Sequence, residues 1–273
     1  MVELNVNGKV AIVTGGARGL GFYCSKILVK ANIKKLIITS RNLKNLERSR
    51  EELLKLAESS ETEILIFEND LSSYKGVEKF YHQVLSLEIK KIDLLILNSG
   101  ATWGEPLETH PESALHKVFD LNVVGLFHTI QLFTPMLTEA ASVSHSRPSR
   151  ILIISSVAGL VSSFPTQGTY GYNMSKSAII HLAKNLALEL APQFNINVNV
   201  ICPGFFPTKM SNGVLEKNGQ NIIDNNPRRR LGIEEDLEYL VLYLCCDQSN
   251  YLNGVIIPVD GGSYLGNAVT SKM

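Results

Sequence analysis

Short apolar segments rich in branched side chains alternate with longer amphipathic segments along most of the chain. The short segments are Lys9–Thr14, Lys35–Ser40, Glu63–Glu68, Ile92–Asn98, Arg150–Ser155, Ile196–Ile201 and Val255–Val259. The longer segments are Gly19–Ala31, Leu43–Ser59, Ser73–Glu88, Pro111–Ala140, Tyr172–Pro192 and Glu234–Cys246. Consecutive apolar positions are typical of strands that helices cover on both faces. The alternation therefore predicts a parallel sheet, because repeated β-α-β units with right-handed crossovers align successive strands.

The length of the chain suits one domain of this kind. Its 273 residues predict a single α/β domain over 1–273, with a Rossmann-type, doubly wound, seven-stranded parallel sheet and helices on both faces. Ser142–Ser149 is polar and contains Pro148, which predicts a surface loop. Phe205–Arg229 holds glycines and asparagines, which predicts an irregular lid loop over the substrate. Residues 263–273 follow the last strand segment, so we expect an exposed C-terminal tail.

Charge and composition exclude several classes of partner. The 26 basic and 26 acidic side chains balance, which argues against a nucleic-acid partner. No apolar run is long enough to span a bilayer. The four cysteines form no C-x-x-C pair and have no histidine at ligand spacing, so we expect reduced thiols and no metal site. We expect a cytoplasmic protein; the alternative is the peroxisomal matrix, because Ser271-Lys272-Met273 is a close variant of the S-K-L signal.

A glycine-rich segment, Thr14–Gly21, follows the first strand segment and opens the first helical one. Glycines there permit a tight turn and a close approach of the backbone to a pyrophosphate. The N-terminus of the following helix offers free N–H groups and the positive end of the helix dipole. The position predicts a dinucleotide phosphate site, although the T-G-x-x-x-G-x-G spacing also fits a purely structural turn.

The end of the second strand segment indicates which dinucleotide binds. An NAD enzyme is expected to place an acidic residue there for the ribose 2′-hydroxyl, but this chain reads Ser40-Arg41. Arg41, together with Arg18 in the glycine turn, supplies two cations where a 2′-phosphate would lie, and Ser40 adds a hydroxyl. These residues favour NADP(H). The alternative is that both arginines are solvated surface residues.

Tyr172 and Lys176 lie four residues apart at the start of a helical segment, so they share one helix face. We predict that the lysine ammonium lowers the pKa of Tyr172, which would then protonate a carbonyl oxygen. Tyr170 has Met174 at the same spacing and therefore no such partner. Taken alone, the pair also fits an amphipathic surface pair.

Two further polar residues stand where ligands bind in such sheets. Ser156 follows the fifth strand segment, where its hydroxyl would stabilise a developing oxyanion; Ser155 is its rival. Asn122 stands among apolar residues in a helical segment and needs a buried partner. It would hold a water that returns protons through Lys176, or it would only cap or kink its helix.

Together these residues resemble the short-chain dehydrogenase/reductase family from Gly8 to Gly262. The resemblance implies a catalytic tetrad of Asn122, Ser156, Tyr172 and Lys176. The cofactor-binding residues that we assign, several of them by resemblance, are Thr14, Gly15, Arg18, Gly19, Leu20, Gly21, Ser40, Arg41, Asp70, Leu71, Asn98, Gly100, Tyr172, Lys176, Ile201, Pro203, Gly204 and Thr208. The cofactor is expected to be NADP(H).

Within the family the chain is most similar to β-ketoacyl reductases, especially the branch of the rhamnolipid-pathway reductase. The similarity rests on Ala101–Gly104, Ser156–Gly159 and Asn197–Pro207. It implies NADPH, a 3-oxoacyl substrate, and a homodimer or homotetramer assembled through Pro111–Ala140 and Tyr172–Pro192.

The chain departs from the family in two places. The usual Asn-Asn-Ala-Gly reads Leu97-Asn98-Ser99-Gly100, so the strand-tying hydrogen bond of the first Asn is missing or replaced. Ser156 and Tyr172 are also 16 residues apart, a few more than usual. We expect the additional residues, within Leu160–Thr169, to bulge into the substrate mouth.

The function we predict is reduction of a ketone by NADPH, with a small carbonyl compound as partner. The alternatives are oxidation of a secondary alcohol and a non-catalytic NADP(H)-binding sensor. The candidates for an apolar substrate mouth are Trp103, Leu160, Phe164, Phe205, Phe206 and Met210. Each of them also fits ordinary core packing. Arg228, Arg229 and Arg230 would meet thioester phosphates at the rim, or would be solvated and cap the next helix.

Overall fold

The computed structural model describes residues 4–141, 147–161 and 168–266. Within these ranges seven parallel strands form one sheet in the order β3-β2-β1-β4-β5-β6-β7. The strands are β1 (Val10–Thr14), β2 (Lys35–Ser40), β3 (Glu63–Glu68), β4 (Leu94–Leu97), β5 (Ser149–Ile154), β6 (Ile196–Pro203) and β7 (Ile256–Val259). The chain reverses its direction of winding between β1 and β4, which confirms the predicted doubly wound sheet.

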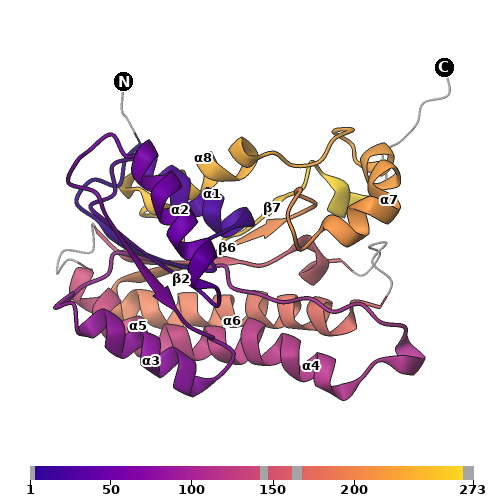
Figure 1. Cartoon of the computed structure of the whole chain (residues 1–273), viewed down its shortest axis with the longest axis horizontal. Coiled ribbons are helices and arrows are strands. Elements are labelled where there is room, and N and C mark those ends of the chain that lie inside the picture. The colour runs from indigo at the N-terminus through magenta and orange to yellow at the C-terminus, as the bar shows by residue number, and fades with distance from the viewer. Residues whose placement is uncertain (1–3, 142–146, 162–167, 267–273) are drawn as a thin grey trace.

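Helices cover both faces of this sheet (Figure 1). On one side lie α3 (Tyr74–Leu85), α4 (Glu112–Phe119), α5 (Leu126–Ala140) and α6 (Tyr170–Phe194). On the other side lie α1 (Gly19–Lys30), α2 (Leu43–Leu56) and α8 (Glu234–Cys245), while α7 (Asn212–Asn225) stands beyond the end of β6. The short 3-10 turns are η1 (Leu107–Thr109), η3 (Val157–Gly159), η4 (Asp247–Ser249) and η5 (Ser263–Leu265).

Each face of the sheet has its own apolar core. Ile12 of β1 points into one core with Phe80 of α3 and Phe133 of α5. Its neighbours in the strand, Ala11 and Val13, point into the other core, with residues of α1, α2 and α8. Because alternate side chains of each strand enter different cores, the strands need apolar residues at consecutive positions.

The expected single helix over Pro111–Ala140 is wrong. Two α-helices, α4 and α5, are joined by a π-helical segment, η2 (Asp120–Gly125). Asn122 in this segment bonds to neighbouring elements, and a Cβ on Gly125 would stand 1.8 Å from the Leu71 carbonyl oxygen. The wider turn therefore lets the backbone pass close to Leu71 while it directs Asn122 inward.

The expected irregular loop over Phe205–Arg229 is also wrong, because most of it forms α7. Gly213 and Gly219 suggested a loop, but they lie on open sides of this helix and meet no close neighbour. Ile222 is the buried residue that anchors the helix. The other predicted ends differ from the observed ones by at most three residues.

The carboxyl ends of the parallel strands meet at one edge of the sheet, where ligands are expected to bind. These ends carry Thr14, Ser40, Ile154 and Pro203, so the residues that follow them meet at this edge.

All four cysteines are buried and free. In the described part of the chain no helix is long and apolar enough to cross a membrane, and no cluster of His, Cys, Asp or Glu could hold a metal ion.

Candidate active site

The predicted phosphate-binding turn has the backbone that such a turn requires. Gly15 and Gly19 have φ of +65° and +54°, which favour glycine, and the Gly15 N–H donates to the Thr39 carbonyl at 2.8 Å. A Cβ on Gly21 would stand 2.2 Å from the Gly15 carbonyl oxygen. Arg18 precedes α1 and supplies no side-chain cap, so the first N–H groups of this helix are open to an anion.

Asn98 and Thr14 tie this turn to β4. The Thr14 hydroxyl accepts from the N–H groups of Asn98 and Ser99, at 3.0 and 3.1 Å. The Asn98 side-chain amide donates to the carbonyl oxygens of Thr14 and Gly15, both at 3.2 Å. These bonds replace the one expected from the family's first Asn, whose position Leu97 fills as a core residue.

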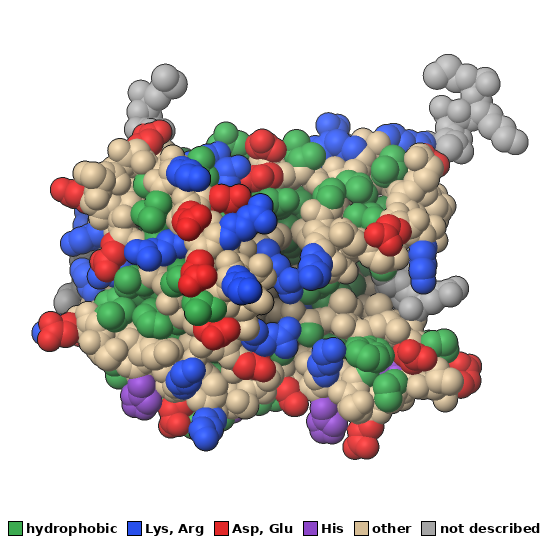
Figure 2. Space-filling view, in the orientation of Figure 1, with side chains coloured by type: hydrophobic (Ala, Val, Ile, Leu, Met, Phe, Trp, Pro, Cys, Tyr) green, Lys and Arg blue, Asp and Glu red, His purple; other side chains and the backbone are tan. Residues whose placement is uncertain are grey.

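The residues assigned to the adenosine end lie at the surface. Arg18 and Arg41 are exposed, and Figure 2 shows basic side chains around a hollow in this face. Asp70 is exposed and accepts from the Ser72 N–H, while Leu71 beside it is buried. The sequence did not single out Glu68, whose carboxylate accepts the Leu43 N–H at the start of α2. That carboxylate is engaged with the helix, and the two arginines stay open to a phosphate.

Asn122 connects three elements at the centre of the molecule. It is 1% exposed, and its side-chain amide bonds to both the N–H and the carbonyl of Ala101, at 2.8 and 2.9 Å. It also donates to the Ser175 hydroxyl on α6 at 2.9 Å. Asn122 therefore holds the segment after β4 against α6, one turn from Tyr172 and Lys176.

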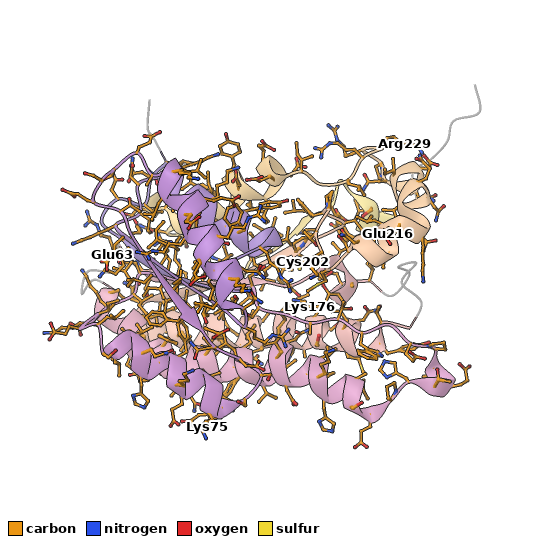
Figure 3. All side chains as sticks on the ribbon, in the orientation of Figure 1. Glu63, Lys75, Lys176, Cys202, Glu216 and Arg229 are labelled. Carbon is orange, nitrogen blue, oxygen red and sulfur yellow. The ribbon has the colours of Figure 1, made fainter. Side chains whose placement is uncertain are left out.

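Ser156, Tyr172 and Lys176 come together above the end of β5. The side chains of Tyr172 and Ser156 are hydrogen-bonded, and Lys176 Nζ lies 5.6 Å from the centre of the Tyr172 ring. Lys176 Nζ donates to the Ile154 carbonyl at 2.9 Å, and the residue is buried (Figure 3 labels it). The spacing of four residues thus places both side chains on the face of α6 that meets the sheet edge.

Ser155 and Tyr170, the alternatives to Ser156 and Tyr172, make contacts of their own. The Ser155 hydroxyl donates to the Lys176 carbonyl at 3.0 Å, so its proton is already used to hold α6. Tyr170 packs edge-on against His110, with 6.0 Å between ring centres, and is exposed. Ser155, Ser156 and Tyr172 line the cavity described below and Tyr170 does not, so the two serines differ in the partner of the Ser155 hydroxyl.

The predicted lowering of the Tyr172 pKa is wrong for this structure. Burial raises the pKa of Tyr172 above its usual value, and the hydrogen bond from Ser156 opposes that rise. Burial also lowers the pKa of Lys176 to about 8. Both groups lose contact with water, so each charged form is disfavoured, and the ammonium points at a carbonyl rather than at the phenol oxygen. Tyr172 is thus protonated at neutral pH, the form that a general acid needs.

A cavity of about 140 Å³ opens beside these residues. It brings Ser156 and Tyr172 together with residues assigned to the cofactor and to the substrate. Those assigned residues are Leu20, Pro203, Gly204, Thr208, Phe205, Phe206 and Met210. Trp103 does not line the cavity; Lys117 Nζ lies 4.7 Å from its ring centre. Phe164 lies outside the described residues.

Sequence reasoning missed several residues of this cavity. Ser211 and Val214, at the start of α7, line it, and so do Thr102 and Thr169. The two α7 residues gave no signal because the segment was taken as a loop. Cys202, which does not line the cavity, was also missed: its sulfur accepts the Ser156 N–H, and burial raises its pKa to about 11. Figure 3 shows Cys202 close to Lys176.

Comparisons with known proteins agree with this geometry. The family model described as short chain dehydrogenase matches residues 9–219. The rhamnolipids biosynthesis 3-oxoacyl-(acyl-carrier-protein) reductase of Pseudomonas aeruginosa is 34% identical over 264 residues, covering 94% of this chain and 97% of that protein.

Solved structures give the same picture. The RhlG/NADP active-site complex of Pseudomonas aeruginosa has a TM-score of 0.86 at 32% identity, over 96% of this chain and 98% of that one. A 7α-hydroxysteroid dehydrogenase, solved with NADH and 7-oxo glycochenodeoxycholic acid, has a TM-score of 0.84 at 26% identity, over 96% and 98%. Chains of this fold thus bind either nicotinamide cofactor.

Proposed function

The chain belongs to the short-chain dehydrogenase/reductase family, and we propose that this oxidoreductase uses NADPH to reduce a ketone that carries an apolar part. The observation that carries the proposal is that Ser156 and Tyr172 line one cavity together with Leu20 of the glycine segment, while Lys176 lies beside the Tyr172 ring.

The residues at the glycine turn fit a dinucleotide. Gly15 and Gly21 leave no room for a Cβ, so the turn keeps its backbone close to the N-terminus of α1. A bound reduced nicotinamide supplies the hydride for the carbonyl carbon. Pro203, Gly204 and Thr208 line the cavity beside Tyr172, where they would hold the nicotinamide end.

The protein's own side chains then handle the carbonyl oxygen. Ser156 donates a hydrogen bond to it and stabilises the negative charge that develops there. Tyr172 donates its phenolic proton to the same oxygen, which yields the alcohol. Lys176 stabilises the phenolate that remains, because its ammonium lies beside the Tyr172 ring.

Arg18 and Arg41 support the preference for NADPH over NADH. Both guanidinium groups are exposed at the edge where the adenosine ribose would lie, and Ser40 stands beside Arg41 at the end of β2. A guanidinium binds a phosphate through paired, charge-assisted hydrogen bonds. No carboxylate follows β2 to bind a free 2′-hydroxyl.

The cavity walls support an apolar acyl substrate. Phe205, Phe206 and Met210 provide an apolar side next to Ser156 and Tyr172. A 3-oxoacyl thioester fits this wall, and the similar Pseudomonas aeruginosa enzyme is named for such a substrate.

We also propose a homodimer or homotetramer. Val124 and Phe127 in η2 and α5, and Leu188 in α6, are exposed on the helices predicted to form the interface. The tripeptide Ser271-Lys272-Met273 lies outside the described residues, so the cytoplasmic and peroxisomal locations stay predictions.

Steady-state kinetics test the proposed function. NADPH oxidation would be followed with acetoacetyl-CoA, a longer 3-oxoacyl-CoA, a diketone and a sugar ketone. The proposal expects turnover of the acyl substrates above that of the sugar ketone. Tight NADPH binding without turnover of any ketone would contradict it and favour a sensor.

A further inference from the structure

A second, larger cavity of about 410 Å³ adjoins the active-site cavity. Phe205 and Phe206 line both cavities, so the two cavities adjoin at these residues. The second cavity lies among the end of α7, the start of α8 and the residues after β7. Its polar lining residues are Asn226, Arg228, Arg230, Asp236, Asp260 and Tyr264.

The three consecutive arginines at this cavity have different environments. Arg230 forms two hydrogen bonds to the Asp236 carboxylate, at 2.5 and 2.8 Å, in the first turn of α8. Arg229 turns away and donates to the Asp224 carbonyl at the end of α7; Figure 3 shows it at the outer corner of the molecule. Arg230 is exposed and contacts the next helix through Asp236, whose carboxylate accepts the Ile233 N–H at the start of that helix.

Arg228 differs from both neighbours. Its side chain lines the cavity, and its guanidinium has no hydrogen-bond or ion-pair partner among the described residues. The Arg228 N–H donates to the Asn226 side chain at 2.8 Å. Its stem packs on Gly261, where a Cβ would stand 3.0 Å from Arg228 Cγ. Arg228 is thus an exposed arginine at the cavity whose stem packs on Gly261.

The carboxylates of the cavity are already engaged. Asp236 is bound by Arg230 and by the Ile233 N–H. Asp260 accepts from the N–H groups of Gly262 and Tyr264 and from the Ser263 hydroxyl. The formal charges of the two arginines and the two aspartates balance. The Arg228 guanidinium donates to no protein group in the described part of the chain, so the cavity can bind an acceptor-rich anion.

Building on the proposed reductase activity, we propose that Arg228 binds an anionic group, a carboxylate or a phosphate monoester, at the end of the substrate remote from its carbonyl. The ketone group lies at Ser156 and Tyr172, and the apolar middle of the substrate passes Phe205 and Phe206. The anionic end then enters the second cavity. The substrate class is an amphipathic ketone with one charged end.

Three matched ketones test this proposal on the full chain: a mid-chain keto acid, its methyl ester, and the phosphate monoester of the corresponding keto alcohol. Arg228→Ala is expected to raise KM for the two anionic ketones about 10-fold or more, the loss of one charge-assisted contact. KM for the methyl ester and for NADPH, and kcat for all three, should not change. Comparing the carboxylate with the phosphate identifies which anion the site prefers.

Arg229→Ala is the matched control, because it removes the neighbouring charge outside the cavity. Arg228→Lys keeps the charge but loses the paired donors, so it should recover part of the affinity. An unreactive medium-chain carboxylate should also inhibit reduction of the methyl ester by the wild type and not by Arg228→Gln.

An equal KM change for charged and neutral ketones, or no change for either, would overturn the proposal. A raised KM for NADPH in Arg228→Ala would also overturn it, because the arginine would then belong to the cofactor site. If the wild type reduced none of the ketones, the reductase function would fail instead. Calorimetric titration of the NADPH-bound protein with the carboxylate would still show whether Arg228 binds the anion.

Discussion

Replacing Arg41 by Asp should change the choice of cofactor. Arg41 is exposed after β2, next to Ser40, and with Arg18 it provides the cations for a 2′-phosphate. A hydrogen bond to a charged group contributes about 1.5–3 kcal/mol, and solvent screening at an exposed site favours the lower end. About 1.5 kcal/mol corresponds to roughly a tenfold rise in KM for NADPH, and repulsion between Asp and the phosphate adds to it.

NADH lacks the 2′-phosphate, so its KM should change little in the same variant. The assay is KM for both cofactors with one ketone at saturation. Arg48→Asp, a charge reversal at an exposed position farther along α2, is the control and should leave the ratio of the two KM values unchanged. An unchanged ratio in Arg41→Asp would remove Arg41 from the cofactor site.

Three further outcomes are expected. Gly21→Ala should abolish NADPH binding, measured by fluorescence titration, because its Cβ would stand 2.2 Å from the Gly15 carbonyl oxygen; normal binding would refute the packing argument. The pKa of Lys176 is lowered to about 8 from 10.5, so between these pH values the unfolded chain holds more protons than the folded one. The free energy of unfolding of the cofactor-free protein, relative to Lys176→Met, should therefore rise with pH across this window in urea titrations; a fall would contradict the assigned direction. Light scattering at micromolar concentration should give a dimer or tetramer mass, and a monomer mass would reject the interface on α5 and α6.

The sequence predicted the parts of the molecule that depend on local spacing. The doubly wound sheet followed from apolar segments at regular intervals, because parallel strands covered on both faces need them. Tyr172 and Lys176 share a face because they are four residues apart on α6. Ser156 follows β5, at the edge where the strands end. Its position close to Tyr172 could therefore also be predicted.

Other features depend on contacts between distant segments. The π-helical segment at Asn122 exists because of Ala101, Ser175 and Leu71, which are remote in the sequence. α7 was missed because glycine is read as a helix breaker, although on an exposed helix it only weakens the helix. The direction of the Tyr172 pKa follows from burial, which helical spacing does not reveal. Likewise, only the structure separates Arg228 from Arg229 and Arg230.

The role of Tyr172 as the proton donor is the central claim. Its most direct test is the Tyr172→Phe variant, measured for both NADPH affinity and single-turnover ketone reduction, with Tyr170→Phe as control. The ring of Tyr172 and its place on α6 are retained, so NADPH affinity should be kept, while reduction should fall about 10²–10⁴-fold with the loss of the acid. Tyr170→Phe should reduce the ketone at nearly the wild-type rate. Near-normal reduction by a folded Tyr172→Phe protein would show that another group protonates the carbonyl oxygen and would contradict the mechanism.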